Sequence, residues 1–190
     1  MIIIAALLIG AGVFFMKSQG DSKESRLYNL PDIFPEEQGG SYKRDFDVIF
    51  EKHADRTGVP FGLLKAHAIQ ESSLKPRAFR DENPSKRQDR LGWASRGLMQ
   101  LLAWPGTTRW SQFGFSSTKT ESDLDALYDP DLNVKLAADL IKSNLKACNG
   151  NLRDAVNMYN AGVKESVRKA PDNYVDRVMG YYSTIIKRTV

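Results

Sequence analysis

The 190-residue chain is poor in the residues that build metal sites and disulfides. It has one cysteine, Cys148, and two histidines, His53 and His67. A single cysteine excludes an intrachain disulfide, and these three residues alone do not make a four-ligand zinc site. We therefore predict no metal and no cofactor. The chain also lacks the GxSxG turn of serine hydrolases, and Cys148 falls on an apolar helical stripe, so neither kind of nucleophilic hydrolase is indicated.

Basic residues are not gathered into a stripe. The net charge of +4 leans weakly towards an acidic partner, which includes nucleic acid, an anionic membrane or an acidic polymer. The sequence contains neither a cluster of arginine and lysine nor a nucleic-acid-binding motif. We expect no nucleic-acid partner.

One long apolar run is present, at residues 1–16. As a helix it would span about 24 Å, short of a bilayer core of ~30 Å, but Lys17 can reach the interface. No Lys or Arg precedes the run, so the basic start of a secretory signal is missing. We predict a membrane segment or signal-anchor, with a buried core helix as the alternative. Residues 17–44 mix Ser, Gly, Pro and both charges, which predicts a linker before a folded domain over 45–190.

That domain is predicted to be mainly helical. Apolar residues recur at three- and four-residue spacing, and no run is typical of a strand. The helical segments are 45–58, 60–72, 133–150, 151–162 and 173–186, and their bounds are marked by signals such as Pro60, the Asp129–Pro130 pair, Asn151 and Gly162. Segments of this kind must pack their apolar faces on one another, which predicts a helical domain.

A carboxylate interrupts one apolar face. In the segment 60–72 the spacing of Phe61, Leu64 and Ala68 is continued by Glu71. Burial disfavours the charged carboxylate and raises its pKa, and a protonated acid in a cleft can donate a proton to a leaving group. The alternative is a core glutamate satisfied by hydrogen bonds, or a helix end facing water. His67, one turn earlier, is interpreted as a packed or hydrogen-bonded core residue.

Motifs further along the chain favour a functional role for Glu71 over a purely structural one. In order they are ESSLKPRA at 71–78, SRGLMQLL at 95–102, YDPDLNVKLAADLI at 128–141, AVNMYNAG at 155–162 and YVDRVMGYY at 174–182. Each is weak alone, but in this order they resemble the lytic transglycosylases of the soluble-lytic-transglycosylase type, over about 46–186. The resemblance implies a lysozyme-like helical domain with a glycan-binding groove. It also implies cleavage of the MurNAc–GlcNAc β-1,4 bond of peptidoglycan with formation of 1,6-anhydroMurNAc, and a match of Glu71 to the catalytic acid/base.

One carboxylate suffices in the resembled family. The glutamate protonates the glycosidic oxygen and then, as a carboxylate, removes the proton of the MurNAc 6-hydroxyl, which closes onto C1 without water. A hydrolytic muramidase on the same fold would need a second acid. No second acid stands in a recognised motif, but Asp81, Glu82 and Asp89 follow Glu71 and stay open as hydrolytic partners. A non-catalytic glycan-binding component of an envelope or phage machine is the third alternative.

The resemblance also suggests residues that bind the glycan, which are Ser72, Met99, Gln100, Tyr159 and Asn160. Ser72 can bond the acid or the sugar, or only its own helix backbone. Gln100 can donate to and accept from an N-acetyl amide, whereas we favour core packing for Met99. The resemblance puts the hydroxyl of Tyr159 near Glu71, and Asn160 is expected to shape the turn that ends its helix.

The stretch 79–95 looks longer than in the resembled family and is dense in charge. We interpret it as a solvated surface loop. The alternative is a lip over the groove, with Lys86, Arg87 and Arg90 facing acidic stem peptides. Trp93 and Trp104 are candidate platforms for sugar stacking, although tryptophan is more often a core residue.

The expected location is the cell envelope, at the periplasmic face of the inner membrane. Peptidoglycan lies outside the cytoplasmic membrane, yet Lys17, Lys23 and Arg26 all follow the apolar run. The positive-inside rule would keep that side of the run in the cytoplasm. A phage virion, which carries the protein to the envelope of the next cell, is therefore the alternative.

Overall fold

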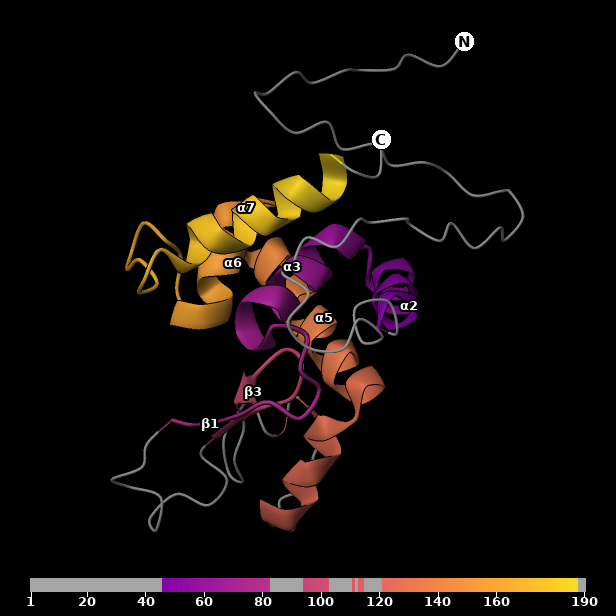
Figure 1. The fold of residues 1–190 in the computed structure, drawn as a ribbon. Helices are drawn as coiled ribbons and strands as arrows, with labels where there is room; N and C mark the ends of the chain where they lie inside the picture. Colours follow the sequence, from indigo (N-terminus) through magenta and orange to yellow (C-terminus); the bar gives the residue numbers. More distant parts are fainter. Residues whose placement is uncertain (1–45, 83–93, 103–110, 112, 115–120, 188–190) are drawn as a thin grey trace, which may run out of the picture.

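The computed structural model describes residues 46–82, 94–102, 111, 113–114 and 121–187 (Figure 1). In chain order they form α2 (Asp47–Thr57), α3 (Phe61–Ser72), β1 (Phe79–Asp81), β2 (Ala94–Arg96), β3 (Leu101–Leu102), the 3-10 helix η2 (Glu121–Tyr128), α5 (Pro130–Ala147), α6 (Leu152–Ala161) and α7 (Tyr174–Lys187). The mainly helical fold is confirmed. The predicted membrane segment 1–16 and linker 17–44 lie outside the described residues, and no helix in the described ranges is long and apolar enough to cross a bilayer.

α3 is the central helix, and it lies between α2 and α7 (Figure 1). The sequence predicts a single apolar face, but the structure buries almost the whole circumference of the helix. Its buried residues are Gly62, Leu63, Leu64, Lys65, Ala66, His67, Ala68, Ile69 and Ser72. A helix surrounded in this way is typical of a domain core. The amine of Lys65 is buried too, and Asp47 of α2 accepts its hydrogen bonds at 2.7 and 2.9 Å, which compensates for its lost hydration.

The start signals of the later helices are confirmed in detail. Asp129 precedes α5, and its carboxylate accepts a hydrogen bond from the backbone N–H of Leu132 at 2.7 Å. Asn151 caps α6 in the same way through the N–H of Asp154, at 3.1 Å. Both side chains satisfy N–H groups that have no partner within a helix. α5 therefore begins at Pro130, three residues before the predicted segment.

A small antiparallel sheet in the order β1-β2-β3 was not predicted. Its strands have two or three residues, too few to show an alternating pattern. β1 and β2 pair with Phe79 opposite Arg96, so the stretch 79–95 begins and ends in paired strands and is not only a surface loop. Its middle lies outside the described residues, together with Lys86, Arg87, Asp89, Arg90, Trp93 and also Trp104.

Asn133, in the first turn of α5, holds the turn between β2 and β3 in place. Its side chain is fully buried, donates to the carbonyls of Arg96 (3.0 Å) and Leu127 (2.8 Å), and accepts from the N–H of Met99 (2.8 Å). Buried polar groups stabilise a fold when all their hydrogen bonds are made. This amide therefore fixes the position of the segment that leads into Gln100.

Gly97 should not tolerate a side chain in that turn. Its φ is +79°, and a Cβ would lie 2.4 Å from both Asn133 Nδ2 and Leu127 O. Gly58, with φ +77° and nothing within 4 Å of such a Cβ, is the matched control. Gly58→Ala should cost about 1–2 kcal/mol for the left-handed backbone, and Gly97→Ala about 1–2 kcal/mol more for the overlap. Urea unfolding of both variants measures the difference, and equal losses would contradict this packing.

Candidate active site

Glu71 lies in the last turn of α3, where the chain leaves the helix through Ser73 and Leu74 in left-handed conformations (φ 52° and 60°). Burial raises the pKa of its carboxyl to about 7. The hydrogen bond from Tyr174 and the charge of Arg80 oppose that rise, and the charge of Glu82 adds to it. The negative end of the α3 dipole also disfavours a carboxylate here. At neutral pH the group therefore exists in both protonation states.

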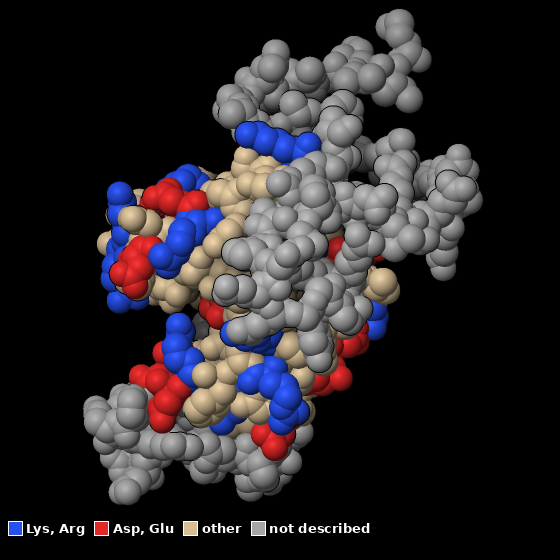
Figure 2. All heavy atoms as spheres, in the orientation of Figure 1, with Lys and Arg blue, Asp and Glu red and all other residues tan. Residues whose placement is uncertain are grey.

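A pocket of about 120 Å³ opens beside Glu71. Its walls come from the end of α3, the sheet, α5 and α6, and its other lining residues are Arg80, Glu82, Ser95, Gln100, Leu101, Leu102, Leu140, Tyr159 and Asn160. Figure 2 shows the surface hollowed between the lobe of α6 and α7 and the part of the molecule that carries the sheet. A concave site with a few polar groups and one perturbed acid is a typical binding or catalytic site.

Three of the predicted binding residues, Gln100, Tyr159 and Asn160, share this pocket with Glu71. Gln100, held at φ 45°, donates from Nε2 to the carbonyls of Ala78 (3.1 Å) and Gly97 (3.0 Å). Its carbonyl oxygen is then the atom that can accept from an amide N–H of a ligand. Asn160 lines the pocket rather than making the turn after α6. Gly162 makes that turn, with φ +74° and a hydrogen bond from its N–H to Met158 O.

Ser72 and Met99 do not line the pocket in the described part of the chain. The Ser72 hydroxyl donates to the carbonyl of Ala68 at 3.1 Å. Of the two predicted alternatives for Ser72, this is the bond to its own helix backbone rather than to Glu71 or the sugar. Met99 is fully buried, so its side chain belongs to the core, as favoured above. Only the backbone of Met99 serves the site, because its carbonyl accepts from Tyr159.

Tyr159, expected near Glu71, lines the same pocket, but the tyrosine that bonds Glu71 is Tyr174. The hydroxyl of Tyr159 donates to Met99 O at 2.7 Å, whereas the hydroxyl of Tyr174 donates to Glu71 Oε1 at 2.5 Å. Tyr174 begins α7 and is buried, and burial together with the contact with Glu71 raises its own pKa, so it stays protonated. The sequence held a signal for it, since Tyr174 lies one helical turn before Val178 on the stripe that faces α3.

A second carboxylate also faces the pocket. Glu82, directly after β1, accepts a hydrogen bond from Arg80 Nε at 2.7 Å and another from the hydroxyl of Ser95. Of the three acids left open above, Asp81 belongs to β1, and Asp89 lies outside the described residues. Glu82 is thus the one that the described structure brings to the same pocket as Glu71. Within the described ranges, no three His, Cys, Asp or Glu side chains come together as a metal-binding group.

Fold and site together define a class of protein, a mainly helical domain with a partly buried glutamate on a pocket between its helices and a small sheet. The chain belongs to the family of transglycosylase SLT domains, which matches residues 48–176. The resemblance inferred from the motifs is therefore confirmed at the level of the family.

Two solved structures are similar to this chain. One is an inactive mutant of the lytic transglycosylase Slt from Pseudomonas aeruginosa, 23% identical over 78% of this chain and 24% of that one, with a TM-score of 0.50. The other is the 70 kDa soluble lytic transglycosylase SLT70 from Escherichia coli, 18% identical over 75% of this chain and 19% of that one, with a TM-score of 0.47. The likeness to the Pseudomonas aeruginosa protein shows a shared fold. The chain spans about a quarter or less of the length of either protein.

Proposed function

We propose that the chain is a peptidoglycan lytic transglycosylase in which Glu71 acts first as an acid and then as a base. The observation that carries this proposal is the partly buried carboxyl of Glu71 on the pocket, with its pKa raised to about 7 and one of its oxygens bonded by Tyr174. Such a group can give up and take back a proton near neutral pH, which a general acid and base must do. A non-catalytic glycan binder has no use for so costly a burial.

The reaction needs no atom from water. Glu71 gives its proton to the glycosidic oxygen, the bond from MurNAc C1 to that oxygen breaks, and GlcNAc leaves with a free 4-hydroxyl. Positive charge develops at C1, where the substrate's own N-acetyl group stabilises it. The Glu71 carboxylate then takes the proton of the MurNAc 6-hydroxyl as O6 bonds to C1. The products are the 1,6-anhydro end and a Glu71 that is protonated again, so the enzyme returns to its starting state.

Hydrolysis is the second candidate, because Glu82 faces the same pocket. A carboxylate across the glycan from the acid can act as the base for water. Glu82, however, already accepts hydrogen bonds from Arg80 and Ser95, which hold its carboxylate in place and occupy its lone pairs. Its carboxylate is better suited to stabilise the positive charge that develops at MurNAc C1 than to activate a water molecule.

Product analysis with Glu82→Gln separates the two reactions. In water labelled with heavy oxygen, the wild type should produce unlabelled 1,6-anhydroMurNAc ends, and Glu82→Gln should give the same product at a moderately lower rate. A general base for water would instead contribute about 10²-fold or more to the rate. Labelled reducing ends in the wild type, with a loss of that size in the variant, would establish the muramidase reaction. Mass spectrometry of the released muropeptides reads both results.

We also propose where in the cell the protein acts. Membership in the SLT family is consistent with action on the cell wall, in the cell envelope. The apolar run 1–16 supports anchoring at the periplasmic face of the inner membrane, with the phage virion as the alternative. External protease should digest the domain in spheroplasts of cells that make the full chain. Complete protection, together with recovery of the protein in purified virions, would favour the virion.

A further inference from the structure

His67 lies one helical turn before Glu71 on α3 and is fully buried. Burial lowers its pKa to about 3, so the ring is neutral at any pH at which the enzyme would work. Nδ1 lies 3.1 Å from the hydroxyl of Tyr174, and that same hydroxyl donates to Glu71 Oε1. The ring also packs on Tyr159, with the ring centroids 4.7 Å apart. A chain of hydrogen bonds thus runs from the core to the proposed catalytic acid.

The chain of hydrogen bonds has a direction. An ionised Glu71 can only accept, so the one hydrogen of the Tyr174 hydroxyl is used in the bond to Glu71. The tyrosine oxygen must then accept from His67, and a neutral imidazole has only one N–H. The hydrogen of His67 is therefore on Nδ1. Nε2 is buried without a hydrogen-bond partner in the described part of the chain, and a bare acceptor is tolerated there better than an unpaired N–H.

We propose that His67 is a positioning residue for the proposed reaction: its Nδ1–H keeps the Tyr174 hydrogen on Glu71 Oε1, so that the catalytic proton resides on the other carboxyl oxygen. This inference rests on the role proposed for Glu71. In the opposite tautomer, Tyr174 would donate to His67 Nδ1, and Oε1 would hold the proton against the tyrosine oxygen. The acid would then be protonated but could not pass its proton to the substrate.

Two of the other groups around Glu71, Arg80 and Glu82, act on it through charge. Arg80 and Glu82 approach from the end of β1, Tyr174 comes from α7, and Tyr159 lies on the α6 side of the pocket. His67 differs from the first two because it is neutral, so its effect on Glu71 passes through the Tyr174 hydroxyl. Removing the Nδ1–H weakens the hydrogen bond that Tyr174 makes to the carboxylate. The pKa of Glu71 should then rise.

The tautomer can be observed directly. In the full chain labelled with ¹⁵N-histidine, His67 should show a pyrrole-type Nδ1 and a pyridine-type Nε2 on both sides of the Glu71 titration. The signals are assigned by their loss in His67→Asn. A pyrrole-type Nε2 in either protonation state of Glu71 would overturn the proposal. This measurement needs no activity, so its result is independent of whether Glu71 proves to be the catalytic acid.

Kinetics test the consequence. His67→Leu should lower kcat for glycan cleavage about tenfold and move the alkaline limb of the pH profile up by about half a unit to one unit, as the loss of one hydrogen bond implies. His67→Asn, which carries an N–H near the place of Nδ1, should restore most of the rate and the profile.

A double variant tests whether the effect passes through the tyrosine. In a Tyr174→Phe background, His67→Leu should have no further effect on either quantity. Additive losses in the double variant, or an unchanged pH profile in a folded His67→Leu, would overturn the positioning role. Cleavage that survives in Glu71→Gln would instead disprove the proposed function.

Discussion

Glu71→Gln should lower the rate of peptidoglycan cleavage by at least about 10³-fold while the protein remains folded. Glutamine keeps the shape of the side chain and can accept the hydrogen bond that Tyr174 gives to Oε1. It can neither donate the proton to the glycosidic oxygen nor take one from the 6-hydroxyl, so both steps fail together. Digestion of purified sacculi, with mass spectrometry of the muropeptides, measures the rate.

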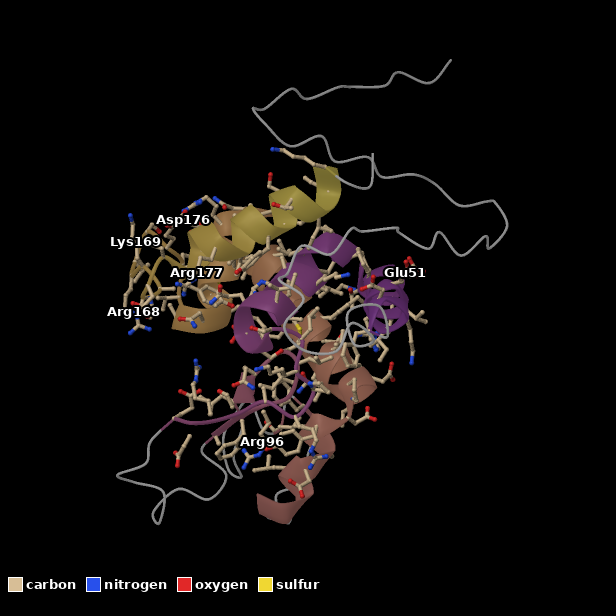
Figure 3. The ribbon with its side chains drawn as sticks, viewed as in Figure 1. Glu51, Arg96, Arg168, Lys169, Asp176 and Arg177 are labelled. Carbon is tan, nitrogen blue, oxygen red and sulfur yellow. The ribbon has the colours of Figure 1, made fainter. Side chains whose placement is uncertain are left out.

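Glu51→Gln is the matched control for this substitution. Glu51 lies on α2, well away from α6 and the sheet (Figure 3). Partial burial and the neighbouring Asp47 and Asp55 raise its pKa as well. A change of glutamate to glutamine there removes a carboxylate with a perturbed pKa but touches no pocket residue, so cleavage should continue at the wild-type rate. If Glu71→Gln cleaves sacculi nearly as fast as Glu51→Gln, the acid must be sought elsewhere.

Local patterns predicted the helices well, because the signals that start and end a helix are local. Asp129 and Asn151 were readable as caps, since a helix end needs a nearby acceptor for its N–H groups. The three short strands were not readable, because two or three residues cannot show an alternating pattern and the turn between β2 and β3 is held by the Asn133 amide of another element. The burial of Lys65 was likewise missed, since it depends on Asp47 of another helix.

The candidate site was only partly predictable, because some of its contacts join residues that are far apart in the sequence. Gln100 and Asn160 stand in motifs of the family, and the structure brings both to the pocket of Glu71. Tyr174 was missed as the partner of Glu71, because the two residues are 103 positions apart and meet only where α7 crosses α3. Which of two tyrosines on apolar stripes reaches the acid is decided by the packing of α6 and α7. No local pattern in the sequence carries that information.

The partly buried carboxyl of Glu71 should also make stability depend on pH. The pKa of Glu71 is raised from 4.5 in the unfolded chain to about 7 in the folded one. As the pH rises through this window, the unfolded chain releases the proton first, so the folded state loses stability relative to it. The contribution is fully present below pH 4.5 and falls by about 3 kcal/mol by pH 8. In Glu71→Gln this contribution is absent at every pH.

The difference in the free energy of unfolding between the wild type and Glu71→Gln isolates the contribution of Glu71. His67 works in the opposite direction, because its lowered pKa costs stability as the pH falls below 6.5, but it does so equally in wild type and variant. The free energy of unfolding, measured in urea at several pH values, should therefore change in Glu71→Gln relative to wild type by about 3 kcal/mol between pH 4 and pH 8, in favour of the variant. Parallel curves would mean that the carboxyl of Glu71 titrates in the folded protein as it does in water. It would then be neither desolvated nor suited to donate a proton at neutral pH.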